Sequence, residues 1–176
     1  MKRNSYFVLI LACVLFVSCQ QDISGTYKAI NPSGQLEKEL IIIDWNEDRY
    51  FERAMIGHAN ELYTDESQRP NRHARIEYDY KAYVKGKLEK QGKKYIAKEL
   101  KAGIDIDEEH LTINNAFLEP LPKITKEELI KYIKEAFDNS IKGKYDDATI
   151  EFVLEGNKLI PVGGNEVNDY FIKLVE

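Results

Sequence analysis

The three histidines and the many carboxylates of the chain are the side chains best suited to bind a metal or move a proton. His58, His73 and His110 are far apart in sequence, and no two of them have the spacing of zinc ligands. The acidic run 105–109 alternates as a calcium loop does, but it lacks the glycine and the bidentate glutamate that such a loop requires. No nucleophile elbow, phosphate-binding loop or zinc-protease motif occurs in the sequence. We therefore predict no metal, no cofactor and no catalytic residue, and an unrecognised hydrolase is the least favoured alternative.

Arg69, Arg72 and Arg75 form the one basic cluster of the sequence. Guanidinium groups match carboxylates and phosphates in a bidentate manner, so the cluster predicts a site for an anionic partner. The alternative is a solvated segment that the two acidic residues just before it neutralise locally. Arg69 and Arg72 fall within 57–73, a polar stretch that we predict to be a long loop, with a short helix over 59–64 as an option, and Arg75 follows just after it.

Five aromatic side chains are predicted to face the interior of the fold, namely Tyr170 and the four residues Phe51, Tyr78, Tyr80 and Tyr95. The interior of a small β-barrel is just wide enough to be filled by side chains or to hold one small ligand. Aromatic walls suit a small hydrophobic or sugar-like ligand, and these four residues are the candidate lining. The alternative is that they only fill the core.

The N-terminal stretch has the order of a secretory signal. Two cations, Lys2 and Arg3, precede the apolar run 6–17, and the small residue Ser18 follows. An apolar run of this length is too short to span a bilayer, which takes about 20 residues. The net charge of −5 becomes more negative when the two cations are removed with the leader, which argues against nucleic acid as a partner.

The segment Phe16-Val17-Ser18-Cys19 resembles the lipobox of bacterial lipoproteins. The resemblance implies that 1–18 is a signal peptide, that Cys19 carries diacylglycerol and an N-acyl chain such as palmitate, and that 19–24 is a short tether. It also implies a lipid-anchored position in the cell envelope, at the outer membrane, on its periplasmic face or at the cell surface. Two or more acyl chains give stable membrane attachment, so the membrane is one predicted partner.

The rest of the chain reads as β-strands joined by tight turns. The clearest is 76–88, where apolar and polar residues alternate with a period of two and Gly86 indicates a bend or bulge. Other predicted strands are 25–30, 39–44, 49–56, 94–100, 104–107, 111–114, 149–154, 158–162 and 168–175. Tight turns make neighbouring strands antiparallel, which excludes a parallel α/β fold.

One amphipathic helix is predicted late in the chain, at about 125–142. Thr125 and Glu128 have the spacing of a capping box, in which each side chain bonds a free backbone amide of the first turn. Leu129, Ile133 and Phe137 then form an apolar stripe at helical spacing that Ile141 continues.

These elements predict a mainly β fold, an antiparallel up-and-down β-barrel or a strongly curled sheet, in a single domain over 25–176. Gly25-Thr26-Tyr27 resembles the opening motif of the calycins, and the layout is similar to that of lipocalin-like lipoproteins, particularly of the Bacteroidetes. The resemblance implies a non-catalytic binding or interaction module of the envelope. The alternative is a structural or assembly lipoprotein that acts through an envelope protein partner.

Overall fold

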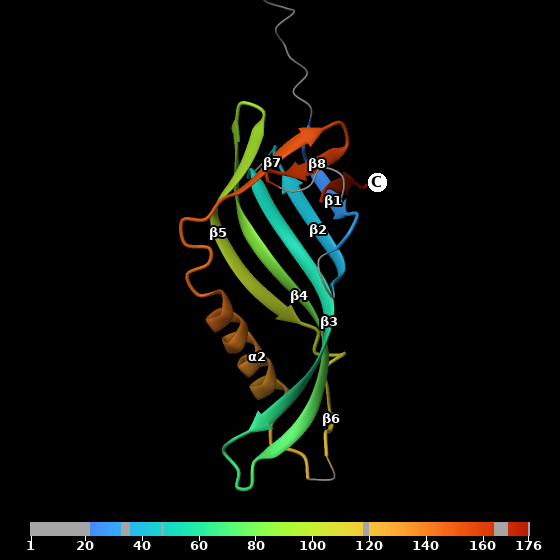
Figure 1. The fold of residues 1–176 in the computed structure, drawn as a ribbon, viewed down its shortest axis with the longest axis vertical. Coiled ribbons are helices and arrows are strands. Elements are labelled where there is room, and N and C mark those ends of the chain that lie inside the picture. Colours follow the sequence, from blue (N-terminus) through green and yellow to red (C-terminus); the bar gives the residue numbers. More distant parts are fainter. Residues whose placement is uncertain (1–21, 33–35, 47, 118–119, 164–168, 176) are drawn as a thin grey trace, which may run out of the picture.

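The computed structural model describes residues 22–32, 36–46, 48–117, 120–163 and 169–175. Cys19 and the leader lie outside these residues. Within them the elements are β1 (Gly25–Ala29), β2 (Leu36–Asp44), β3 (Tyr50–Asp65), β4 (Arg72–Gln91), β5 (Lys94–Ile106), β6 (Thr112–Asn115), α2 (Lys126–Ile141), β7 (Ile150–Glu155), β8 (Lys158–Pro161) and β9 (Phe171–Lys173) (Figure 1).

Eight of the strands close an antiparallel barrel, which confirms the predicted fold class. The strands follow one another around the ring in chain order, except that β6 is left out, and β9 pairs with β1 to close it. β6 instead pairs with the first part of β4, outside the ring. Every pairing in the ring is antiparallel. Because successive side chains of a strand point to opposite faces, each strand buries one face in the barrel and presents the other to solvent.

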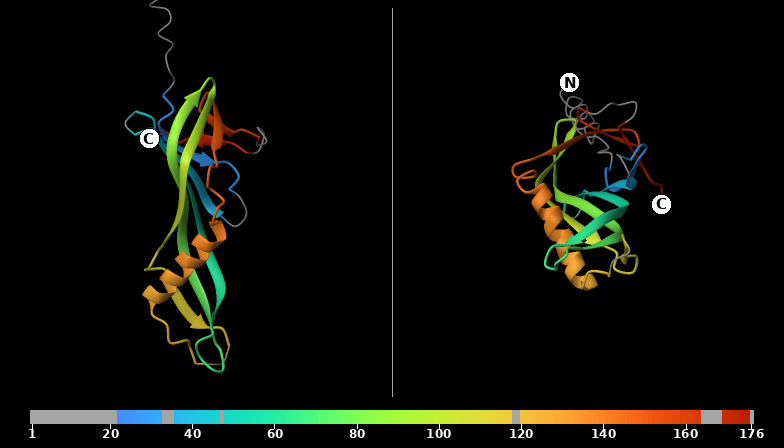
Figure 2. Two further views of the ribbon diagram at one scale, coloured as in Figure 1. Left: turned by 90° about the vertical axis from the view of Figure 1, so that its left-hand side faces the viewer. Right: turned by 60° about the horizontal axis from the view of Figure 1, so that its bottom comes forward.

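The hairpin of β3 and β4 is much longer than the barrel. Its pairing runs without a shift from Tyr50 opposite Lys87 to Asp65 opposite Arg72. β2 pairs with β3 only as far as Gly57, and β5 leaves β4 at Tyr80. The far half of the hairpin therefore projects beyond the barrel, with β6 beside β4 and α2 packed against the sheet (Figures 1 and 2).

Two hydrophobic cores correspond to these two halves. The barrel core contains fully buried aromatic and aliphatic side chains from most strands of the ring, among them Tyr27, Phe51 and Phe152. The second core lies between the projecting hairpin and α2. Its buried members are Ile76, Tyr78, Leu111, Leu129, Ile130 and Ile133.

The helix and the long fourth strand agree with the sequence patterns. α2 begins after Thr125, and both bonds of the predicted capping box are present. The inward residues of β4, from Ile76 to Leu88, are the predicted apolar set. Opposite Gly86 the register of β5 shifts by one residue, which confirms the predicted bulge, and a Cβ at Gly86 would lie 2.5 Å from the carbonyl oxygen of Lys98.

Two predictions of the sequence analysis are wrong, one at the projecting half and one in the barrel. Residues 57–73 are not a long loop with a short helix over 59–64, because β3 continues to Asp65 and β4 already begins at Arg72. The alternation of polar and apolar residues is weak here, and pairing with β4 imposes the strand conformation on it. Residues 94–100 and 104–107 are likewise parts of one strand, β5. Of the predicted strand 168–175, Phe171–Lys173 forms β9, and residue 168 is outside the described ranges.

Candidate functional site

The interior of the barrel is packed with side chains that include two of the predicted ligand-lining residues. Phe51 is fully buried, with its ring centre 5.5 Å from that of Phe152. Tyr95 is nearly as buried and packs edge-on against Trp45 at 5.5 Å. Core filling, the alternative to a ligand lining, describes both environments.

Tyr27 closes the same core near the start of the described chain. Its hydroxyl donates a hydrogen bond to the carbonyl oxygen of Ile23 at 2.7 Å. Burial raises the pKa of Tyr27 to about 12, so this hydroxyl stays a neutral donor at physiological pH.

The other two predicted lining residues, Tyr78 and Tyr80, lie in the second core and not in the barrel core. The Tyr78 hydroxyl donates to Glu61 Oε1 at 2.5 Å, and burial followed by this bond raises the pKa of Tyr78. Tyr80 covers Gly57, where an added Cβ would lie 2.8 Å from the Tyr80 hydroxyl oxygen. All four aromatic residues face inward as predicted, but they belong to two separate cores and do not line one pocket.

A polar pair that the sequence analysis did not single out lies at the rim of the barrel. Glu39 is on the inward face of β2 with only 2% of its surface exposed, and Arg53 Nε donates to its Oε1 at 2.6 Å. The pair borders a cavity of about 270 Å³ together with Tyr170 and Phe171. Arg53 is about one third exposed and is one of the residues that line this cavity. The cavity is large enough for a small polar molecule.

The basic cluster lies at the far end of the projecting hairpin. Arg69 is in the turn and donates to Asn71 Oδ1 at 3.0 Å, while Arg75 on β4 donates to Asn60 Oδ1 at 3.0 Å. Arg72 is the first residue of β4. None of the three guanidinium groups forms an ion pair with a carboxylate of the described residues. Asp65 stands directly opposite Arg72 across the hairpin, so one of the two neighbouring acidic residues remains beside the cluster.

Exposed apolar side chains accompany these arginines. Leu62 on β3 stands opposite Arg75 and is 57% exposed. Phe117, which follows β6, is 54% exposed and packs edge-on against the ring of His73 at 5.6 Å. His73 and Arg75 share one face of β4, because residues two apart point to the same side. We call Leu62, His73, Arg75 and Phe117 the tip surface.

Polar pairs cover the rest of the outer face of the projecting hairpin. Going away from the barrel, His58 bonds Asp79, Asn60 bonds Glu77 at 2.9 Å, and Thr64 bonds His73 at 3.0 Å. Each of these pairs stands directly opposite across β3 and β4, and only the pair of Leu62 and Arg75 has no such bond. Leu62 is thus an exposed apolar residue inserted into a polar ladder.

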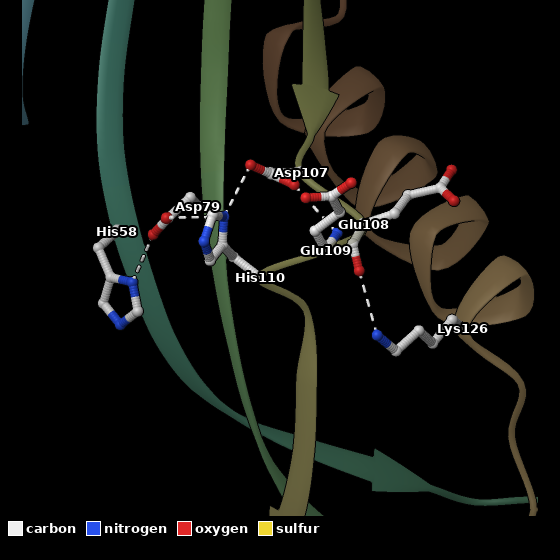
Figure 3. A network of polar contacts seen from close by, with 7 residues as sticks. All are labelled: His58, Asp79, Asp107, Glu108, Glu109, His110 and Lys126. Atoms are coloured by element: carbon white, nitrogen blue, oxygen red, sulfur yellow. Dashed lines mark hydrogen bonds and ion pairs between the residues drawn. The ribbon is translucent and has the colours of Figure 1, made fainter.

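A second polar network joins three segments on the outer face, where β5 leaves β4 (Figure 3). His58 Nδ1 lies 2.8 Å from Asp79 Oδ1, and His110 Nδ1 lies 2.8 Å from Asp107 Oδ2 and 3.6 Å from Asp79 Oδ2. The hydrogen bond and charge of Asp107, with the charge of Asp79, raise the pKa of His110. Lys126 at the start of α2 donates to the carbonyl oxygen of Glu108, which ties this turn to the helix.

The ion pairs and hydrogen bonds of this network connect β3, β4, the turn after β5 and the start of α2. The described residues contain no group of three or more histidine, cysteine, aspartate or glutamate side chains placed to hold a metal ion. The network was not foreseen from the sequence, because its members are brought together only by the register of β3, β4 and β5.

Among the described residues, no helix is long and apolar enough to cross a membrane. No family model, no curated protein and no solved structure matches the chain.

Proposed function

We propose that this protein is a lipid-anchored lipoprotein of the bacterial envelope that works without catalysis, as an interaction module for a protein partner. The anchor is the lipid on Cys19, and the short tether 19–24 holds the barrel close to the bilayer. The order of the leader residues and the lipobox-like segment before Cys19 support this attachment. We place the protein at the outer membrane, on its periplasmic face or at the cell surface.

One observation carries the interaction role, namely the opposite placement of the two ends of the molecule. β1, where the described chain begins, and the turn between β3 and β4 lie toward opposite ends of the long axis (Figure 1). The exposed apolar residues Leu62 and Phe117 and the arginine cluster are near that turn. A lipid anchor before β1 would therefore direct the tip surface away from the membrane. The packed barrel core also favours recognition on the outside of the molecule.

The anchor is tested by metabolic labelling with a clickable palmitate analogue. We expect label on the wild-type protein and none on Cys19→Ala, with Cys13→Ala as the matched control that keeps its label. Protease treatment of intact cells then distinguishes the periplasmic face from the cell surface. Equal labelling of wild type and Cys19→Ala would contradict the proposed attachment.

The interaction role is tested by photocrosslinking in the native envelope. A photoreactive amino acid at position 117, on the tip surface, should give one dominant crosslinked partner. The same amino acid at exposed position 38 on the barrel is the matched control and should give little. Replacing Arg69, Arg72 and Arg75 with glutamine should remove the dominant product. Similar products from both positions would contradict a specific role for the tip.

The cavity at the barrel rim supports a second candidate function, the binding of a small polar or sugar-like molecule. The partly exposed Arg53 side chain and the ring of Tyr170 provide a hydrogen-bond donor and an aromatic surface beside it. Native mass spectrometry of delipidated protein from its own envelope would show a retained small molecule, and Arg53→Met should lose it. Protein that is uniformly without a bound molecule would leave the interaction role alone.

A further inference from the structure

The projecting half of β3 has a free edge. β2 pairs with β3 only up to Gly57, and the pairing on the other side, with β4, continues to Asp65. Within the part of the chain that the structure describes, residues 58–65 therefore have a neighbouring strand on one side only. A free strand edge presents unpaired backbone groups that can accept another strand.

The register identifies which residues present those groups. In an antiparallel pair, opposite residues alternate between pairs that exchange backbone bonds and pairs that do not. Leu88 N donates to Arg49 O at 2.6 Å, so the odd-numbered residues of β3 bond to β4. The bond from Asp107 N to Asp79 O, on the other side of β4, gives the same alternation. The amide and carbonyl groups of Asn60, Leu62 and Thr64 therefore point away from β4, to the free edge.

This edge lacks several of the features by which proteins usually block strand addition. The segment 58–65 contains no proline, no lysine and no register shift. Its two carboxylates are both held by hydrogen bonds, since the exposed Glu61 accepts from the Tyr78 hydroxyl and the buried Asp65 accepts from Ser67 and Gln68 in the turn. The exposed residue at its centre is Leu62, a hydrophobic side chain.

We propose that the free edge of β3 binds an extended acidic segment of a partner protein as an added strand. The segment would bond the backbone of Asn60, Leu62 and Thr64 and place an apolar side chain beside Leu62. Its acidic side chain would meet Arg75, whose guanidinium already lies over β3 on Asn60 Oδ1 and has no carboxylate partner among the described residues. This inference rests on the proposed interaction role of the tip and names the partner class.

A second copy of the chain fits this edge less well. The side chains on the outer face of 58–65 are His58, Asn60, Leu62 and Thr64, so a copy would bring no carboxylate to Arg75. Antiparallel pairing of two identical edges also turns one molecule end for end relative to the other. Their lipid anchors would then point in opposite directions, away from a shared membrane.

The test is a selection of random octapeptides on the purified full-length protein in detergent. We expect enriched peptides that combine acidic and branched apolar residues. Their binding should fall at least about tenfold in Leu62→Pro, which removes an outward amide without removing a bond to β4, and in Arg75→Glu. The matched control Leu62→Ala keeps the amide and should lose only a few fold. In the wild type, a bound peptide should slow hydrogen exchange at Asn60, Leu62 and Thr64 and leave Ala59 and Glu61 unchanged.

Three results would overturn the proposal: no enriched peptide, enriched peptides without acidic residues, or exchange protection elsewhere on the protein. A concentration-dependent dimer in sedimentation that Leu62→Pro abolishes would assign the edge to a second copy instead. Crosslinking from position 117 in cells distinguishes a failure of the strand-addition proposal from a failure of the proposed interaction role. A crosslinked partner that persists in Leu62→Pro leaves the interaction role in place and removes only the strand-addition mode.

Discussion

The same two strands, β3 and β4, run through both halves of the molecule, and their surroundings differ. In the barrel each strand has two neighbours, and the enclosed side chains include the fully buried Phe51 and Phe152. Beyond Gly57, and among the described residues, the hairpin is joined only by the short β6 and α2, and one edge of β3 has no neighbouring strand. Closing a sheet removes its edges, whereas projecting from it exposes one. The barrel is therefore suited to holding the fold, and the projecting half to contact with a partner.

The outer faces of the two halves show a matching difference. On the barrel, Glu52 of β3 is buried to 5% exposure among Tyr50, Lys81 and Lys85, and Lys81 Nζ lies 2.5 Å from its Oε1. The bonds from Lys81 and Tyr50 outweigh burial and lower the pKa of Glu52. On the projecting half the outer-face pairs are exposed, and Leu62 interrupts them. The buried carboxylate of Glu52 and its cationic neighbours connect β3 to β4 on the barrel. The outer-face pairs of the projecting hairpin are accessible to another chain.

The largest expected effect comes from the barrel core. Phe51→Ala removes a ring that contacts Phe152 at full burial and should lower the free energy of unfolding by about 3–5 kcal/mol. Urea unfolding followed by circular dichroism measures this loss. The matched control is Leu62→Ala on the same strand, which should cost less than about 0.5 kcal/mol because Leu62 is exposed. Equal losses from both substitutions would show that the two halves do not differ as described.

A somewhat smaller effect is expected in the second core. Leu129 of α2 is fully buried against the projecting hairpin, and Leu129→Ala should cost about 2–4 kcal/mol. If the halves are separately stabilised, hydrogen exchange should accelerate at residues 59–64 and 74–78 and stay slow in the barrel strands. Lys134→Ala, at an exposed position of the same helix, is the control and should leave both sets of amides unchanged. Uniform acceleration would instead indicate one cooperative unit.

The parts of the fold that sequence patterns predict are those fixed by local chemistry. The inward face of β4, the bulge opposite Gly86 and the capping box at Thr125 all depend on neighbouring residues along the chain. The continuation of β3 to Asp65 does not depend on neighbouring residues along the chain, because the polar segment 57–65 takes its strand conformation from pairing with β4. The sequence therefore predicts the barrel better than the projecting hairpin.

The residues of the candidate site also fall into two groups, those that sequence patterns reveal and those that only the strand register brings together. Arg69, Arg72 and Arg75 are close in sequence and remain together at the tip, and the lack of carboxylate partners among the described residues is a structural finding. Leu62 joins them only through the register of β3 on β4. The network of His58, Asp79, Asp107 and His110 also needs that register, so no spacing rule in the sequence could reveal it.

The start of α2 gives a smaller and more local prediction. The Thr125 hydroxyl accepts from Glu128 N at 3.2 Å, and Glu128 Oε2 accepts from Thr125 N at 2.9 Å. Thr125→Ala removes the first bond and should cost about 1 kcal/mol of unfolding free energy. The matched control Thr125→Ser keeps the hydroxyl and should recover most of it. Because the helix covers only the second core, exchange at residues 74–78 should respond to the alanine variant more than exchange in the barrel. A loss confined to the barrel amides would contradict this assignment.

The smallest expected effect is the pH dependence of the network at the junction of the two halves. Asp107 and Asp79 raise the pKa of His110 above its ordinary value of 6.5, so the folded state binds the proton more tightly than the unfolded state. The resulting stabilisation is fully present below about pH 6.5 and is lost as the pH rises through the folded-state pKa. The lowered pKa of Asp107 acts only in acid, below 3.8, and does not overlap with this window.

Urea unfolding at about pH 6 and pH 8 measures the stabilisation that the protonated His110 provides. His110→Gln should flatten the fall in unfolding free energy over that interval. His73→Gln is the matched control, because His73 Nδ1 bonds the Thr64 hydroxyl at 3.0 Å and no carboxylate, and it should keep the wild-type slope. Because His110 joins β4 to the turn after β5, exchange at Asp79 and Asp107 should rise with pH more in the wild type than in His110→Gln. Identical pH profiles for wild type and His110→Gln would show that the junction network does not hold the two halves together.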